Sequence, residues 1–233
     1  MAFHFLFTIV AILAFTSPLF IFAYDPSPLD DFCVAVSDSS AAVFVNGKIC
    51  KNPKLVTTED FHLSAGFHKP GNTSGPSGSA VNPVDVNRFP GLNTLGITIV
   101  RADFAPNGFV SPHTHPRATE IIFLLEGSLY VGFVASNPGS NMKKKLFVKV
   151  LEPGDIFVFP MGLIHFQLNV GKTDAVGFVT FNSQNPGVVS YGNDLFATDP
   201  LISPDLLARS FQLDKKVVQN LQSQPWFGPN VVT

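Results

Sequence analysis

The chain has 233 residues, of which 45% are hydrophobic and 14% charged, and its formal net charge is -2. This length and composition allow one sizeable core, so we expect a single folded domain and exclude an intrinsically disordered chain. The 15 Lys and Arg against 17 Asp and Glu form no basic excess, which excludes the electrostatic signature of a nucleic-acid-binding protein.

Residues 1–23 read MAFHFLFTIVAILAFTSPLFIFA, an apolar run that ends at Ala23 and is followed by a polar, proline-containing stretch. This pattern predicts a secretory signal peptide over 1–23, although its start lacks Lys or Arg. The alternative is an uncleaved membrane anchor, but Thr16, Ser17 and Pro18 interrupt the run. No later stretch reaches 18 apolar residues, so we expect a soluble, secreted mature chain over 24–233.

Two cysteines and an N-glycosylation sequon follow the predicted signal peptide. In the oxidising secretory route we expect Cys33 and Cys50 to form a disulfide worth on the order of 3 kcal/mol. A catalytic thiol is the alternative, although no histidine lies near either cysteine in the sequence. Asn72 begins the sequon Asn-Thr-Ser within the Gly-, Pro- and Ser-rich stretch 69–79, where we expect an exposed loop and a glycan.

From residue 94 onward, short runs of apolar and β-branched residues alternate with turn signals such as Glu126-Gly127 and Pro153-Gly154. Many short strands at close spacing favour an antiparallel sandwich or barrel over a βαβ fold. The expected strands are Thr94–Phe104, Glu120–Leu125, Ser128–Ala135, Lys145–Leu151, Asp155–Phe159, His165–Asn169 and Ala175–Asn182.

Helical signals are confined to the end of the chain. Ser203 is expected to cap a helix over Leu206–Phe211, and Asp214 to open a helix over Lys215–Ser223. Such helices pack outside an all-β domain or join a partner. The sequence therefore predicts one all-β domain over 24–233 with C-terminal α-helices.

The stretch SPHTHPRATE, residues 111–120, carries the first candidate metal ligands. Residues i and i+2 of a strand share a face, so His113 and His115 are expected to point the same way. Pro116 has no amide hydrogen to donate and ends that strand, and Glu120 begins the next one. The three side chains are therefore expected to converge at one corner, although a polar turn with buried, satisfied histidines gives the same pattern.

His165 is the candidate for a fourth ligand, because it follows the turn Pro160-Met161-Gly162 and begins an expected strand. Three imidazoles and one carboxylate form a nitrogen and oxygen donor set without a thiolate, and affinity alone does not choose among Mn, Fe, Ni and Zn. Gln167 and Asn169 follow at the strand period. They either hold waters beside the ligands or bond to the backbone.

Two spaced motifs resemble those of the cupin superfamily, namely His113-x-His115-x4-Glu120-x6-Gly127 and Gly154-x5-Pro160-x-Gly162-x2-His165-x3-Asn169. Four stretches resemble more specifically the germins and germin-like proteins of plants: Phe32–Ala35, His113–Glu120, His165–Asn169 and Phe181–Gly187. The resemblance extends over essentially the whole mature chain, including the cysteine pair.

This resemblance implies a cupin β-jellyroll barrel with one Mn(II) ion per protomer, held by His113, His115, Glu120 and His165. It also implies a homohexamer built as a trimer of dimers, residence in the apoplast or cell wall, and a part in plant defence or wall processes. We expect no nucleic-acid partner and, after signal cleavage, no membrane partner.

The family resemblance leaves the reaction open, because some members are oxalate oxidases and others show superoxide dismutase activity. In the oxidases two asparagines near the metal hold oxalate, and an ungapped alignment from the His-x-His motif places Val100 and Val110 there. Apolar walls would deprive a small dianion of hydrogen bonds. We therefore expect Mn-dependent superoxide dismutase activity and not oxalate oxidase activity.

Oxalate oxidation remains an alternative to dismutation, and two others stand beside it. One is a non-enzymatic extracellular glycoprotein or receptor-like binding protein with a structural metal; the other is metal-dependent chemistry on a larger apolar metabolite. Arg117 either pairs with an acid at a protomer contact or lies in solvent. Of the other histidines, His4 belongs to the signal peptide, and His62 and His68 are expected at the surface.

Overall fold

The computed structural model describes residues 34–37, 42–45, 48–138, 143–226 and 230–231. The predicted signal peptide over 1–23 and the predicted disulfide partner Cys33 lie outside these residues. None of the helices among the described residues is long and apolar enough to span a lipid bilayer.

Strands dominate the described structure, as predicted. A two-stranded sheet pairs β1 (Ala42–Val45) with β2 (Lys48–Lys51), and three short 3-10 helices lie farther along the chain at η3 (Pro53–Leu55), η4 (Thr58–Phe61) and η5 (Pro90–Leu92). The other strands are β3 (Ser79–Val84), β4 (Thr98–Phe104), β5 (Phe109–Thr114), β6 (Glu120–Glu126), β7 (Leu129–Pro138), β8 (Lys144–Leu151), β9 (Ile156–Phe159), β10 (His165–Asn169), β11 (Ala175–Phe181), β12 (Val189–Ser190) and β13 (Asn230–Val231).

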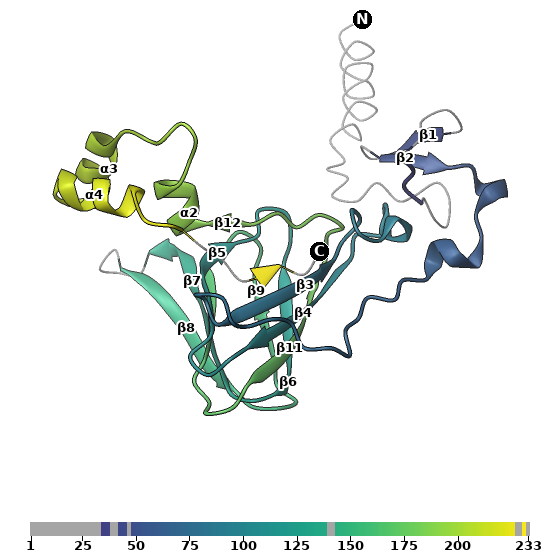
Figure 1. Cartoon of the computed structure of the whole chain (residues 1–233), viewed down its shortest axis with the longest axis horizontal. Coiled ribbons are helices and arrows are strands. Elements are labelled where there is room, and N and C mark those ends of the chain that lie inside the picture. The colour runs from purple at the N-terminus through teal and green to yellow at the C-terminus, as the bar shows by residue number, and fades with distance from the viewer. Residues whose placement is uncertain (1–33, 38–41, 46–47, 139–142, 227–229, 232–233) are drawn as a thin grey trace, which may run out of the picture. The chain divides into compact units, whose positions relative to one another are not determined.

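These strands form two larger sheets (Figure 1), one in the order β12-β5-β10-β7-β8 and the other in the order β13-β3-β4-β11-β6-β9. The pairings are antiparallel except that between β13 and β3. One hydrophobic cluster takes residues from both sheets. The predicted all-β sandwich or barrel is therefore confirmed.

The period of two along β6 explains which side chains enter this core. Ile122 and Leu124 are fully buried, whereas Ile121 and Leu125 on the opposite face are 40% and 41% exposed. Glu120 shares the inward face with Ile122 and is buried as well. The strand that builds the core thus also carries a carboxylate into the interior.

Each predicted strand is present with small shifts at its ends, but the predicted start at Thr94 is wrong. β4 begins at Thr98, because Thr94 and Gly96 have φ values of 68° and 66° and lie outside extended geometry. Three strands that the pattern did not predict, β3, β12 and β13, complete the two sheets.

Three helices follow the last long strand: α2 (Tyr191–Phe196), α3 (Pro204–Phe211) and α4 (Lys215–Gln222). Both predicted caps are confirmed, since Ser203 accepts from Leu206 N at 3.4 Å and Asp214 accepts from Lys216 N at 2.7 Å. The helices pack around a small hydrophobic cluster of their own, with buried side chains Phe196, Leu207 and Val218.

Candidate metal centre

Four buried side chains meet where the two sheets face each other. His113 lies near the end of β5, His115 directly follows that strand, and His165 begins β10 beside it. His165 and His113 are opposite each other in the β10–β5 register. Glu120 begins β6 of the other sheet and pairs there with residues of β9 and β11. The site thus joins both sheets through the three histidines and the glutamate.

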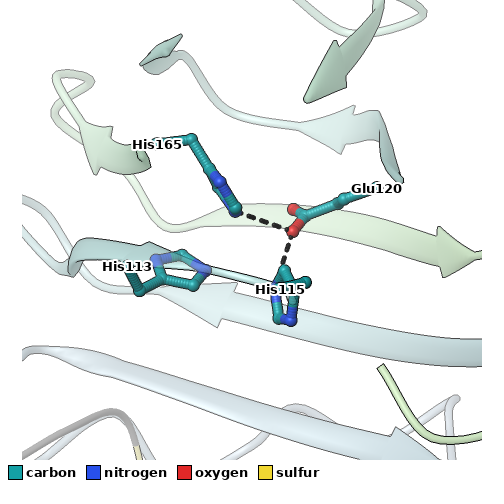
Figure 2. A group of neighbouring side chains, drawn as sticks. All are labelled: His113, His115, Glu120 and His165. Atoms are coloured by element: carbon teal, nitrogen blue, oxygen red, sulfur yellow. Dashed lines mark hydrogen bonds and ion pairs between the residues drawn. The ribbon is translucent and has the colours of Figure 1, made fainter. Parts of the chain in front are cut away.

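Figure 2 shows the three imidazole rings and the Glu120 carboxylate gathered at one centre. One ligand atom from each residue lies within 4.8 Å of the others. The Nε2 atoms of His115 and His165 are each 3.1 Å from Glu120 Oε2. All four residues are at most 5% exposed. The four predicted ligand residues are therefore brought together in a water-poor site.

Each imidazole is oriented by a backbone carbonyl on its far side. His113 Nδ1 lies 2.8 Å from Ser111 O, His165 Nδ1 lies 2.8 Å from Leu163 O, and His115 Nδ1 lies 2.5 Å from Gly187 O. A carbonyl oxygen only accepts, so these contacts assign the hydrogen to Nδ1 in all three rings. A neutral ring then turns its Nε2 lone pair toward the centre of the site.

This tautomer places two nitrogen lone pairs against one carboxylate oxygen. Without a positive charge between them, His115 Nε2, His165 Nε2 and Glu120 Oε2 would repel one another. A metal cation resolves this arrangement, and histidine ligands in proteins commonly donate the other ring N–H to a carbonyl or carboxylate. The donor set therefore fits a divalent ion.

The ionisation of the site agrees with that fit. Burial, together with the electrostatic effect of His165, lowers the pKa of His113 to about 4, so this ring is neutral at neutral pH. Burial by itself would raise the pKa of Glu120, but the close approach of His115 and His165, together with the electrostatic effects of His165 and His113, outweighs burial and holds the pKa at about 2. Neutral imidazoles beside an ionised carboxylate are the ligand forms that a divalent ion requires.

Gln167 and Asn169, for which the sequence left two roles open, differ in what they contact. Gln167 Nε2 donates to Glu120 Oε1 at 3.0 Å, so this amide positions the carboxylate. Asn169 is fully buried and donates to the backbone carbonyls of Phe104, Ala105 and Thr173, while its Oδ1 accepts from Gly171 N. Gln167 thus belongs to the metal centre, and Asn169 holds the backbone around the end of β10.

Local sequence reasoning missed the segment 185–187, which supports His115 through the Gly187 carbonyl. Arg117 binds this segment three times: its backbone N–H donates to Pro186 O at 3.2 Å, Nε donates to Asn185 O at 2.9 Å, and Nη2 donates to Asn185 Oδ1 at 3.2 Å. Arg117 is exposed and holds this segment within its own chain, while its pairing with an acid at a protomer contact stays a prediction. The signal that pointed to this segment was the family-like stretch Phe181–Gly187.

A cavity of about 340 Å³ lies beside the quartet, with His113, His115, Glu120 and Gln167 in its wall. Val100 and Val110 also line it, and most of the other lining side chains are apolar.

The remaining predicted residues lie away from this centre. His62 and His68 are exposed, as predicted. Cys50 is disulfide-bonded, while its pairing with Cys33 stays a prediction. Asn72 is exposed in a loop, where its Oδ1 accepts from Ser74 N at 3.0 Å and from Ser74 Oγ at 2.7 Å.

Comparison with known proteins agrees with this fold and site. A family model described as Cupin matches residues 65–219. Germin-like protein subfamily 1 member 20 of Arabidopsis thaliana is 57% identical over 205 residues, covering 88% of this chain and 90% of the relative. Member 7 of the same subfamily and organism is 55% identical over 214 residues, covering 92% and 91%.

Two solved structures are similar as well. A recombinant oxalate oxidase in complex with glycolate is 46% identical with a TM-score of 0.78, covering 85% of this chain and 96% of that chain. Peruvianin-I, a cysteine peptidase from Thevetia peruviana latex, is 41% identical with a TM-score of 0.62, covering 71% and 97%. Since the family model matches most of the chain and curated relatives are more than half identical along it, the chain belongs to the cupin family and, within it, to the germin-like proteins of plants.

Proposed function

We propose that this chain is a secreted Mn(II)-binding protein of the plant apoplast with superoxide dismutase-type activity. The observation that carries the proposal is the buried quartet of His113, His115, Glu120 and His165, with every Nδ1 held by a carbonyl and the Nε2 atoms left for an ion. The choice of Mn(II) rests on the family, because this donor set accepts several divalent ions.

The chain's own residues supply what dismutation requires. The quartet would hold a Mn ion, whose Mn(II)/Mn(III) couple would supply the redox chemistry for oxidising one superoxide and reducing the next. Gln167 holds the ionised Glu120, and this single carboxylate would leave a divalent ion at the site with a net positive charge that attracts the superoxide anion. Val100 and Val110 exclude bulk water without offering hydrogen bonds to a larger anion.

Oxalate oxidase activity is not expected, even though an oxalate oxidase is among the similar structures. Oxalate is a dianion, and an apolar wall at Val100 and Val110 leaves its carboxylate oxygens without donors. A hydrogen-bonding site commonly discriminates by several orders of magnitude between ligands that do and do not fulfil its bonds. Valines in place of hydrogen-bond donors at these two positions should therefore disfavour the binding of oxalate.

The test measures metal content, superoxide loss and oxalate-dependent peroxide on the purified secreted protein. We expect one Mn per protomer and superoxide loss in the wild type. His165→Ala should lose more than about 100-fold in metal affinity. Loss of a residue that only hydrogen-bonds to a metal ligand already costs about 10–100-fold, and loss of the ligand itself should cost more. His68→Ala, an exposed histidine outside the site, is the matched control and should keep both metal and activity.

Three outcomes decide among the functions. A full Mn complement without superoxide loss in the wild type would overturn the dismutase proposal and favour a non-enzymatic glycoprotein with a structural metal. Peroxide formed from oxalate at a substantial rate would show that the argument from the two valines is wrong. Equal metal loss in His165→Ala and His68→Ala would refute the assignment of the ligands.

We further propose cleavage of the signal peptide 1–23, a glycan on Asn72 and a homohexamer built as a trimer of dimers. Exposed apolar side chains on an edge strand of each larger sheet support an oligomer: Leu146, Val148 and Val150 on β8, and Ile156 and Val158 on β9. Mass spectrometry of the mature N-terminus and glycan, with light scattering for the assembly, tests these proposals. A monomer at micromolar concentration would refute the hexamer.

A further inference from the structure

The cavity beside the quartet is larger than superoxide requires. Its volume of about 340 Å³ corresponds to roughly eleven times the ~30 Å³ that one water molecule occupies in the liquid. Pockets for small organic molecules begin at about 300 Å³. A diatomic ligand would therefore leave most of this space without a specific occupant.

The wall of the cavity suits a mainly apolar ligand with little charge. Valines from several strands line it, and none of the described residues that line it is Lys or Arg. Two acidic side chains, Asp85 and Glu120, line it as well. A dianion would meet these acids with no cationic side chain of the wall to pair with, whereas a neutral ligand would bring no unpaired charge into the cavity.

One polar atom at the metal end of the cavity still lacks a hydrogen-bond partner. Gln167 Nε2 donates to Glu120 Oε1 at 3.0 Å, and this hydrogen bond fixes the orientation of the amide. That orientation leaves Gln167 Oε1 buried with no partner in the structure. A buried acceptor without a partner is costly, so this atom favours a ligand that brings a hydrogen-bond donor.

We propose that the cavity binds a small, mainly apolar molecule with one hydroxyl group, of which phenol is the simplest aromatic example; this inference rests on the proposed function, in that the quartet holds a divalent ion. The hydroxyl hydrogen is donated to Gln167 Oε1, and the hydroxyl oxygen faces the quartet. The apolar body packs against Val100 and Val110. One functional group thereby satisfies both the buried acceptor and the metal end of the site.

Calorimetric titration of Mn-loaded protein with phenol tests the proposal, with Mn per protomer and superoxide loss measured on the same sample. We expect saturable binding of phenol and no comparable binding of oxalate. Val110→Asn should weaken phenol binding about tenfold, because a polar amide replaces part of the apolar wall. Val170→Asn is the matched control: Val170 is 49% exposed and does not line the cavity, so phenol binding should be unchanged.

The role of the hydroxyl is tested by comparing phenol with toluene, which has a similar body and no hydroxyl. The wild type should prefer phenol by about tenfold, and Gln167→Met should abolish this preference while leaving toluene affinity unchanged, because only phenol uses the Gln167 acceptor. Mn content of each variant separates loss of the acceptor from loss of the metal.

The failures of the two proposals are distinguishable. Protein that holds Mn and removes superoxide but does not bind phenol would overturn the ligand inference alone. Oxalate binding as tight as phenol binding, or equal effects of Val110→Asn and Val170→Asn, would overturn it as well. Protein that takes up no Mn would overturn the proposed function, and the ligand inference would fall with it.

Discussion

Gly187→Ala probes how the chain orients His115 without altering any proposed ligand. Gly187 has φ +67°, and its carbonyl holds His115 Nδ1 at 2.5 Å. A Cβ at this position would lie 2.7 Å from Nη2 and 3.0 Å from Cζ of Arg117. The Arg117 guanidinium would have to move, and its hydrogen bonds to Asn185 would break.

The size of the effect follows from these contacts. A non-glycine residue in the left-handed region costs about 1–2 kcal/mol of folding free energy. Loss of the two Arg117–Asn185 hydrogen bonds adds about 1 kcal/mol to the loss of folding free energy. This is the low end of the usual contribution of two hydrogen bonds, because Arg117 is exposed. Displacement of the Gly187 carbonyl releases the His115 ring, and loss of such an outer partner lowers metal affinity about 10–100-fold.

Gly66→Ala is the matched control, because Gly66 has a similar φ of +73° and a Cβ there would meet no heavy atom within 4 Å. In urea denaturation Gly66→Ala should lose about 1–2 kcal/mol and Gly187→Ala about 2–3 kcal/mol, but only Gly187→Ala should lose Mn affinity, measured by titration against a fluorescent chelator. Equal Mn affinity in Gly187→Ala, Gly66→Ala and wild type would refute the claim that this carbonyl positions the ligand.

Three further predictions concern acid, metal and the backbone around β10. Metal-free protein should lose about 3 kcal/mol of unfolding free energy as the pH falls from ~6.5 toward ~4, because the unfolded His113 ring gains a proton in this range while the folded state holds its pKa at about 4. In urea denaturation the unfolding free energy of His113→Gln should depend less on pH than that of the wild type. Mn at 100 times its dissociation constant should stabilise the wild type by ~2.7 kcal/mol and His165→Ala hardly at all, as thermal unfolding will show. Asn169→Leu should cost about 2–4 kcal/mol in urea denaturation by leaving buried carbonyls unpaired, and wild-type stability in this variant would contradict the role of Asn169.

The convergence of three candidate ligands, His113, His115 and Glu120, was predictable from the sequence because local rules place them at one corner. The two-residue period brings His113 and His115 to one side, Pro116 ends the extended segment, and Glu120 begins the inward face of β6. Two of the three ring orientations are local as well, since His113 and His165 each bond to the carbonyl two residues earlier.

Contacts between distant segments were not predictable in this way. The carbonyl that orients His115 lies 72 residues away, and Arg117 reaches 68 residues to hold Asn185. The choice between the two roles of Gln167 and Asn169 likewise depends on tertiary contacts, because both sit on the same face of β10 with nearly equal burial. The two residues differ in what they donate to: Gln167 donates to the Glu120 carboxylate, and Asn169 donates to backbone carbonyls.

The strand register places Val100 and Val110 in the cavity wall and apart from the four candidate metal ligands. Val110 is opposite Gln167 in the β5–β10 ladder, and Val100 is opposite Val179 in the β4–β11 ladder, so both valines face the cavity beside, but outside, the ligand quartet. An amide at Val110 would stand across from Gln167 and offer a donor to its buried Oε1. The same substitution would thus add polarity for an anion and remove the acceptor that a ligand hydroxyl uses. Under the proposed function, Val100 and Val110 would therefore decide which class of ligand binds, while His113, His115, Glu120 and His165 stay unchanged.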